Sequence, residues 1–217
     1  MISTGLKKID DFLSGGIPNG VIVDIFGGNG TGKTQLLLQL SINSIKNGGK
    51  VLFLDTTGGF RPERILEIQK KSNSNLNLLN NIIVSRITNT SEQINSIKNF
   101  KENNFSLIII DNITDLFSYE YKHNQSIFKK NSLFMKYMRE LSLYAVTHKV
   151  PIVITNMIRN SNEQEVENMS TAIDLFTHIK IHLFKNSSIY NGEISSPFNK
   201  ENFSYTITSS GLSDVEF

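Results

Sequence analysis

One stretch of the chain combines glycines with a lysine and a threonine at the spacing G-x-x-x-x-G-K-[ST]. In such a loop the glycines let backbone N–H groups turn onto phosphates, the lysine reaches the β and γ phosphates, and the last hydroxyl ligates Mg²⁺. The expected ligand is therefore a nucleoside triphosphate, ATP with Mg²⁺. The residues expected to bind it are Gly27, Gly28, Asn29, Gly30, Thr31, Gly32, Lys33 and Thr34.

Two aspartates directly follow apolar runs. Asp111 follows Leu107–Ile110, the arrangement by which proteins with such a loop deliver an acid beside the metal. We therefore expect Asp111 to hold Mg²⁺ together with Thr34, although an Asp here can also simply end a strand or cap a helix. Asp55 likewise follows Val51–Leu54, at the edge where open α/β sheets bind ligands. The alternative for Asp55 is a residue that forms a turn.

Short β-branched runs recur along the chain and alternate with helical patterns, which is typical of a parallel sheet covered on both faces. The expected strands are Val21–Phe26, Val51–Leu54, Ile82–Val84, Leu107–Ile110 and Pro151–Thr155. The sequence therefore predicts an α/β fold in which the glycine loop joins the first strand to a helix.

Four helical patterns lie between these runs. The first is expected to begin in the glycine loop and to bury one stripe, made of Leu36, Leu37, Leu40 and Ile45. The second follows Pro62. The third is expected to begin at Thr90, with its hydroxyl as the cap, Gln93 reaching back, and Ile94 and Ile97 facing inward. The fourth carries the stripe Phe134, Met138, Leu141 and Ala145.

The pattern changes to strict alternation near the C-terminus. The inward series are Ile179, Ile181 and Leu183, and later Phe203, Tyr205 and Ile207. They predict closing strands in antiparallel arrangement. The segment 185–202 is polar and contains Gly192 and Pro197, so we expect a hairpin connection or a mobile loop there.

Composition excludes several classes of function. Lys and Arg number 22 against 20 Asp and Glu, and a net charge of +2 does not favour a protein held to nucleic acid mainly through phosphates. The chain has no cysteine, which excludes disulfides, thiolate metal sites and thiol catalysis. Neither a signal peptide nor a membrane span is recognisable, so one soluble, cytoplasmic domain covering residues 1–217 is expected.

Several motifs together carry a resemblance to a known family. Beside the glycine loop they are Ser3–Asp10, Leu54–Arg64 (L-D-T-T-G-G-F-R-P-E-R), Leu107–Asp111 and Ile154–Asn156. The chain resembles the core of the RecA/RadA recombinases, and its short length and Gly-Gly after Asp-Thr are most similar to the archaeal RadB-like paralogs. The resemblance implies a RecA-type P-loop fold with a mainly parallel sheet, ATP binding at the sheet edge, single-stranded DNA binding by two loops, and work in recombinational repair.

Two positions depart from the family pattern. Full recombinases have Glu after Asp-Thr, where it orients the attacking water, whereas this chain has Thr57. Losing a general base costs about a hundred- to ten-thousand-fold in rate, roughly 3 to 5 kcal/mol of barrier, and leaves phosphate binding largely intact. The family also places a Gln that senses the γ phosphate where this chain has Met157, which cannot donate to phosphate. With Lys33 and Asp111 as the remaining candidate catalytic residues, ATP binding with slow hydrolysis is expected.

Candidate DNA contacts lie at the positions of the family's two DNA loops. The first loop combines cations with aromatic rings, Lys122, His123, Lys129 and Lys130 with Tyr119, Tyr121 and Phe128. Charge and stacking together suit single strands, and the alternative is a solvated loop whose aromatic residues pack on the core. The second loop holds Arg159 beside three acids, Glu163, Glu165 and Glu167. Because these acids would repel a phosphate backbone, the second loop is not expected to clamp DNA.

Other charged residues admit structural interpretations. Arg61 and Arg64 could contact the nucleotide or a neighbouring subunit, or could be surface charges of a helix. His178 and His182 would lie roughly 13 Å apart on a strand, too far to share one zinc ion.

Three functions stay open at the level of the sequence. The first is an ATP-binding paralog that assists homologous recombination, binds single-stranded DNA and works with a RadA-type recombinase or other repair proteins. The second is an active DNA-dependent ATPase that catalyses strand exchange, with Glu63 or Asp115 as a substitute base. The third is a nucleotide-switched partner subunit that does not bind DNA. Full-length recombinases carry an N-terminal DNA-binding domain and a linker, whereas this chain starts at the core, so autonomous filaments are not expected.

Overall fold

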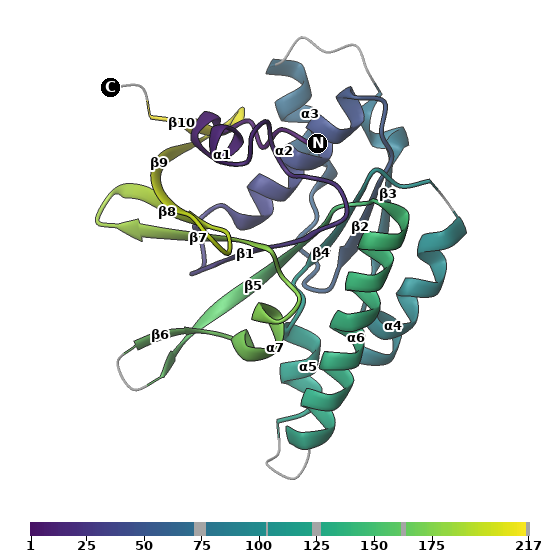
Figure 1. Ribbon diagram of the computed structural model, residues 1–217. Helices are drawn as coiled ribbons and strands as arrows, with labels where there is room; N and C mark the ends of the chain where they lie inside the picture. The colour runs from purple at the N-terminus through teal and green to yellow at the C-terminus, as the bar shows by residue number, and fades with distance from the viewer. Residues whose placement is uncertain (72–76, 103, 123–126, 162–163, 216–217) are drawn as a thin grey trace.

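The computed structural model describes residues 1–71, 77–102, 104–122, 127–161 and 164–215. Its strands are β1 (Ile22–Gly27), β2 (Val51–Asp55), β3 (Ile82–Arg86), β4 (Leu107–Asp111), β5 (Ile152–Ser161), β6 (Gln164–Glu167), β7 (Ile179–Asn186), β8 (Ile189–Ser195), β9 (Lys200–Thr208) and β10 (Gly211–Asp214). They share one sheet with the order β10-β9-β8-β7-β1-β5-β4-β2-β3, and β6 lies off this path beside β5 (Figure 1).

The centre of the sheet is parallel. β1 lies between β5 and β7, and β4, β2 and β3 continue the parallel pairing beyond β5. All five strands predicted from apolar runs are confirmed, and β5 continues past the predicted Thr155 to Ser161. In β4, Leu107 and Ile109 pack into one core while Ile108 and Ile110 pack into the other. Burial on both faces explains why these strands read as continuous apolar runs.

Helices cover both faces of the sheet. On one face lie α1 (Lys7–Phe12), α2 (Lys33–Lys46), α3 (Pro62–Lys71) and the 3-10 helix η1 (Leu78–Asn81). On the other lie α4 (Thr90–Asn95), the 3-10 helix η2 (Ser96–Glu102), α5 (Asp115–Glu120), α6 (Ile127–His148) and α7 (Ser170–Asp174). The predicted stripes of α2 and α6 are buried, as expected. Within the described ranges, no helix combines the length and apolarity needed to cross a bilayer.

The predicted cap of the third helix is wrong by one residue. Asn89 is the N-cap, and its side chain accepts from the Glu92 backbone N–H at 2.8 Å. The Thr90 hydroxyl instead donates to Glu120, and Gln93 donates to the carbonyl of Ile113 at 2.9 Å. Asn and Thr are adjacent cap formers, and the bond from Thr90 to α5 decides which of them begins the helix.

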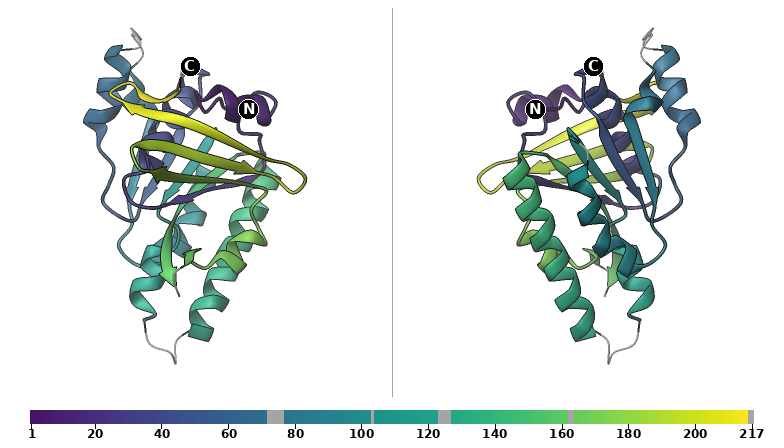
Figure 2. Two further views of the ribbon diagram at one scale, coloured as in Figure 1. Left: turned by 90° about the vertical axis from the view of Figure 1, so that its left-hand side faces the viewer. Right: turned by 90° about the vertical axis from the view of Figure 1, so that its right-hand side faces the viewer.

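The C-terminal prediction needs two corrections. β7 is parallel to β1, and antiparallel pairing begins with β8 and continues through β9 and β10. The polar segment 185–202 contains the whole of β8 rather than a loop. One face of β7, β8 and β9 has no helix in front of it in the left-hand view of Figure 2. Side chains on an uncovered sheet face are commonly polar. The polar residues of β8 therefore lack the apolar pattern by which other strands were predicted.

Parallel register brings the predicted functional positions to one edge of the sheet. Gly27 at the end of β1 lies opposite Met157 of β5, and Asp55 at the end of β2 lies opposite Asp111 of β4. All four residues thus lie at the carboxyl edge of the parallel strands, where open α/β sheets bind their ligands.

A group of charges around the buried Asp24 links β1 to β6, α7 and β7. Asp24 of β1 is fully buried, and Lys180 of β7 lies 3.7 Å from its carboxylate. The same ammonium group contacts Glu167 of β6 and, at 2.5 Å, Asp174 of α7. Burial raises the pKa of Asp24 well above its ordinary value, the neighbouring Glu167 and Asp174 raise it further, and Lys180 opposes them. Asp24 therefore keeps its proton to higher pH than it does in the unfolded chain.

This shift predicts that Asp24 makes folding less favourable as pH rises. The unfolded chain releases the Asp24 proton near pH 4 while the folded chain retains it, so the free energy of unfolding falls above that pH. Replacing Asp24 by Asn, which cannot ionise, should raise stability near pH 8 by about 1.4 kcal/mol for each unit of pKa shift, with little difference near pH 3. Urea unfolding at both pH values measures the change, and Asp11→Asn, at an exposed position of α1 outside this group of charges, is the control. Equal gains at the two pH values would contradict this account of Asp24.

Candidate nucleotide-binding site

The glycine loop lies between β1 and α2 in a conformation that requires its glycines. Gly27 has φ +149°, and a Cβ atom there would lie 2.0 Å from the carbonyl oxygen of Leu183. Gly32 has φ +92°, and a Cβ atom there would lie 3.0 Å from Ile207 of β9. Both positions combine an unfavourable backbone angle with close neighbours, so residues with side chains are excluded.

Lys33 is the first residue of α2, and its ammonium group lies over the loop. Its Nζ donates to the carbonyl oxygens of Gly27 and Gly28, at 2.8 Å each. Burial lowers the pKa of Lys33, and the nearby carboxylates of Asp111 and Asp115 raise it. The cation therefore lies within the field of two acids at the mouth of the loop.

Asp111 is buried and bonded by two hydroxyl groups. Thr34 donates to one carboxylate oxygen at 2.9 Å, and Thr155 donates to the other at 2.5 Å. Burial raises the pKa of Asp111, whereas the bonds from Thr155 and Thr34 lower it. The Thr34 hydroxyl and the Asp111 carboxylate thus lie side by side. They are oxygen donors of the kind that Mg²⁺ prefers, and Mg²⁺ usually binds through few protein ligands plus substrate phosphates.

A cavity of about 480 Å³ opens where these groups meet. It is lined by Asn29, Gly30, Thr31, Gly32, Lys33, Thr34, Gln35, Thr57, Asp111, Asn112, Met157 and Ile207. Most of the predicted loop, the predicted metal ligands and the two departures from the family pattern therefore share one space.

Asp55 forms a turn, which is the alternative to ligand binding that the sequence left open for this residue. One carboxylate oxygen accepts backbone N–H groups of Thr57, Gly58 and Gly59 at 2.7 to 3.1 Å, and the other accepts that of Phe60 at 3.2 Å. Arg86 of β3 lies 3.5 Å from the same carboxylate. With its lone pairs used in this way, Asp55 shapes the loop that presents Thr57 to the cavity.

Thr57 and Met157 occupy the positions at which the family has a base and a phosphate sensor. The Thr57 side chain is exposed, and its hydroxyl lies 3.3 Å from Asp55 and accepts from the Gly59 N–H at 3.2 Å. Glu63 and Asp115 are the two carboxylates that could replace the missing base. Glu63 is exposed, whereas Asp115 lies close enough to Lys33 and Asp111 to interact electrostatically with both. Burial first and then Asp111 raise the pKa of Asp115.

Asn156 connects the cavity to the β5–β6 hairpin. Its side-chain oxygen accepts from the Thr114 hydroxyl at 2.7 Å, while its nitrogen donates to Glu167 at 2.8 Å and to the carbonyl of Asn168 at 2.7 Å. These bonds and that of Thr155 join residues far apart in the chain, so sequence alone does not reveal them.

The candidate DNA residues lie apart from the cavity lining. Lys122 lies over the ring of Tyr119, 4.3 Å from its centroid, and Lys129 belongs to the first turn of α6 with Lys130. Tyr119 is 71% exposed and Phe128 is 90% exposed, so the alternative in which these two rings pack on the core is wrong. Tyr121, in contrast, packs partly against the core. His123 and Glu163 lie outside the described residues.

Three arginines, Arg159, Arg61 directly before α3 and Arg64 within α3, have partners within the chain. Arg159 lies close enough to Asp115 to lower the pKa of that acid. Arg64 donates to Gln35 at 2.8 Å and to the carbonyl of Thr208 at 2.5 Å, and Arg61 donates to the carbonyl of Gly58 at 2.9 Å. Arg61 and Arg64 therefore stabilise the walls of the site through backbone and side-chain contacts.

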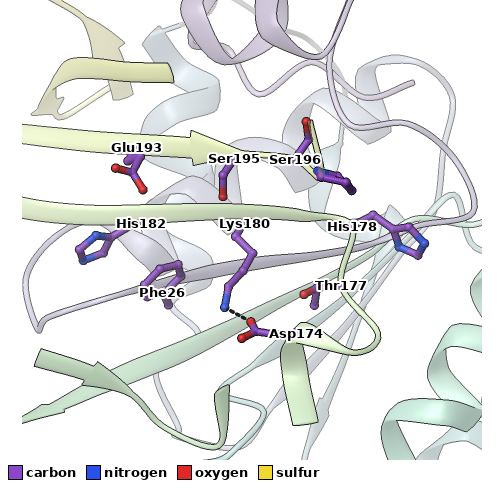
Figure 3. A pocket seen from close by; sticks show the side chains of 10 residues that line it. Phe26, Asp174, Thr177, His178, Lys180, His182, Glu193, Ser195 and Ser196 are labelled. Atoms are coloured by element: carbon purple, nitrogen blue, oxygen red, sulfur yellow. Dashed lines mark hydrogen bonds and ion pairs between the residues drawn. The ribbon is translucent and has the colours of Figure 1, made fainter. Parts of the chain in front are cut away.

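A second cavity of about 410 Å³ lies over β7 and β8. Figure 3 shows Lys180 between His182 and His178, with its ammonium group directed toward Asp174. The ring of His182 stacks on that of Phe26 with 4.6 Å between centroids. Stacking and ion pairing thus engage Phe26 with His182 and Lys180 with Asp174 in this cavity.

Replacing Asp55 by Asn should weaken the loop that carries Thr57. An amide oxygen is a poorer acceptor than a carboxylate and cannot serve four N–H groups, so we expect a loss of about 2 to 3 kcal/mol in the free energy of unfolding. Urea unfolding measures the loss, with Asp11→Asn at an exposed position of α1 as the control. A change no larger than that of the control would refute the structural role of Asp55.

Comparisons with known proteins agree with this geometry. The chain matches the Rad51 family over residues 1–184. The "DNA repair and recombination protein RadA" of Cenarchaeum symbiosum (strain A) is 36% identical over 172 residues, which cover 74% of this chain and 43% of that relative. The matched part of this chain therefore covers less than half the length of this relative. With most of its residues matched and a mainly parallel sheet closed by antiparallel strands, the chain has a RecA-type fold and belongs to the Rad51 family of RecA/RadA proteins.

Proposed function

We propose that this protein binds ATP with Mg²⁺ at the 480 Å³ cavity and hydrolyses it slowly. The observation that carries the proposal is the contact of Thr34 with Asp111 beside Lys33, at the mouth of the glycine loop. Backbone N–H groups of the loop and the start of α2 favour phosphate, and Lys33 adds a positive charge. Mg²⁺, when bound, would neutralise charge on the phosphates, with Thr34 and Asp111 as its protein ligands.

Slow hydrolysis follows from the groups around the expected γ phosphate. Thr57 lacks a basic atom near neutral pH, and Met157 offers no donor to phosphate. Asp115 is the better placed of the two substitute bases, because it shares the electrostatic field of Lys33 and Asp111. The second proposal is accordingly an active DNA-dependent ATPase that uses Asp115 and catalyses strand exchange.

The biological role that we propose is assistance to homologous recombination and DNA repair. Support comes from the Rad51 family match and from the printed name of the RadA relative. Within the family we propose an archaeal RadB-like paralog that works with a RadA-type recombinase or another repair protein. Thr57 and Met157 favour this assignment, since both remove groups that full recombinases use.

Direct binding of single-stranded DNA is proposed for the tip formed by α5 and α6. Exposed rings at Tyr119 and Phe128 lie among the cations Lys122, Lys129 and Lys130, an arrangement that suits stacking with charge. Arg159 is a weaker candidate, because Asp115 and Glu167 lie on the surrounding elements. A partner subunit that is switched by nucleotide without touching DNA is the remaining candidate.

Turnover of ATP separates the slow switch from the active enzyme. We expect hydrolysis below about one per minute, with or without single-stranded DNA, and an increase of about a hundredfold in Thr57→Glu because a carboxylate can orient the attacking water. Thr57→Gln is the matched control, because Gln has the same shape as Glu but lacks the basic carboxylate oxygen. Lys33→Ala gives the background of the assay.

Two results would contradict this reading of Thr57. One is unchanged hydrolysis in Thr57→Glu while the protein still binds ATP. The other is faster turnover in the unsubstituted protein that Lys33→Ala abolishes; loss of that turnover in Asp115→Asn would then assign the base to Asp115.

DNA binding at the tip of α5 and α6 predicts a dependence of affinity on salt. Each phosphate contact on a single strand contributes a slope of about −0.7 in a plot of log affinity against log salt. Replacing Lys129 and Lys130 by Gln should flatten the slope by about 1.4, measured by fluorescence anisotropy with a labelled oligonucleotide. Lys7→Gln with Lys8→Gln, on the distant α1, is the control pair. An unaltered slope excludes the proposed patch, and absence of binding favours the partner subunit that does not touch DNA.

A further inference from the structure

Tyr205 of β9 contacts the glycine loop from the far end of the chain. Its hydroxyl donates to the carbonyl oxygen of Thr31 at 2.5 Å, across 174 residues of sequence. The side chain is 1% exposed, so water does not compete strongly for this bond. The ring lies beside those of Tyr190 and Phe203, with 5.6 and 5.8 Å between centroids. A packed ring and a buried bond together give the hydroxyl one position.

This bond sets the direction of the next backbone N–H. In a planar trans peptide the carbonyl and the following N–H point in opposite directions. The Thr31 carbonyl accepts from Tyr205 of β9, so the Gly32 N–H points to the opposite side of that peptide, and both Thr31 and Gly32 line the cavity. Gly32 also precedes α2, where backbone N–H groups lack partners within the helix and are available to an anion.

The hydroxyl remains a donor over the ordinary range of pH. Burial raises the pKa of Tyr205, and the neighbouring Tyr190 raises it further. A second contact from the same strand accompanies the bond, since Ile207 packs against Gly32. β9 therefore constrains both sides of the Thr31–Gly32 peptide.

We propose that Tyr205 is a positioning residue for phosphate binding, whose hydroxyl holds the Thr31–Gly32 peptide so that the Gly32 N–H faces a phosphate oxygen of the nucleotide. This inference rests on the proposed binding of ATP and adds a residue outside the glycine loop to that site. It assigns a function to the C-terminal strand, because the chain must complete β9 before the loop has its phosphate-binding conformation.

The test compares Tyr205 with the neighbouring Tyr190. Tyr205→Phe removes the hydroxyl and keeps the ring, and Tyr190→Phe does the same to the neighbouring ring, whose hydroxyl does not contact the loop in the described residues. Calorimetric titration with ATP and Mg²⁺ should show about tenfold weaker binding for Tyr205→Phe and unchanged binding for Tyr190→Phe. Thermal unfolding of each variant confirms that the protein titrated is folded.

A spectroscopic measurement separates positioning from general loosening. In protein labelled with ¹⁵N at its 14 glycines, ATP should move the Gly32 amide resonance strongly in the unsubstituted chain and clearly less in Tyr205→Phe at saturation. The Gly48 amide, at the opposite end of α2, should be the same in both proteins. Suppose that the unsubstituted protein binds ATP, and that Tyr205→Phe binds it equally and shows the same Gly32 shift. The role of Tyr205 is then refuted, while the proposed binding of ATP stands. If the unsubstituted protein does not bind ATP, the proposed function falls and takes this inference with it.

Discussion

Parallel pairing of β1, β5, β4 and β2 is the constraint on which the site depends. Because parallel strands end at the same edge, the residues that follow them meet in space although they are far apart in the chain. The register opposes Gly27 to Met157 and Asp55 to Asp111, and a slip of one residue would reverse the faces on which these side chains lie. Burial of both faces of these strands makes such a slip costly, so the hydrophobic cores fix the geometry of a polar site.

Two aspartates at this edge show how partners decide the role of a residue. Asp55 and Asp111 both end apolar strands and lie opposite each other. Asp55 accepts backbone N–H groups of one loop, and these bonds occupy both of its carboxylate oxygens. Asp111 accepts only hydroxyls in the described contacts, from Thr34 and Thr155, and hydroxyls can rotate to another acceptor. The carboxylate that can exchange partners without unfolding a turn is the one suited to a metal ion.

The sequence was sufficient for the features that depend on local pattern. The place of the glycine loop between a strand and a helix, the five apolar strands and the buried stripes of α2 and α6 all follow from spacing and polarity, and the structure confirms them. Features that depend on the fold could not be read in advance. Thr155 and Tyr205 contact the site across 44 and 174 residues, and β8 is polar because one sheet face has no helix over it. Asn89 and Thr90 have similar cap propensities, and a tertiary bond to Glu120 separates them.

Polar contacts continue from the candidate nucleotide site into the β5–β6 hairpin, where Met157 stands in place of the family's phosphate sensor. Met157 cannot bond a phosphate, yet the adjacent Asn156 bonds Glu167 of β6 at 2.8 Å. Glu167 in turn contacts Lys180, which lies beside the buried Asp24 of the strand that leads into the glycine loop. A change in the position of Asn156 would therefore alter the contacts of the buried Glu167 near the buried Asp24, where unpaired charges are costly. A series of polar contacts thus joins the hairpin to the candidate site, and it is a physical route by which a bound nucleotide would affect the hairpin although Met157 replaces the family's sensor.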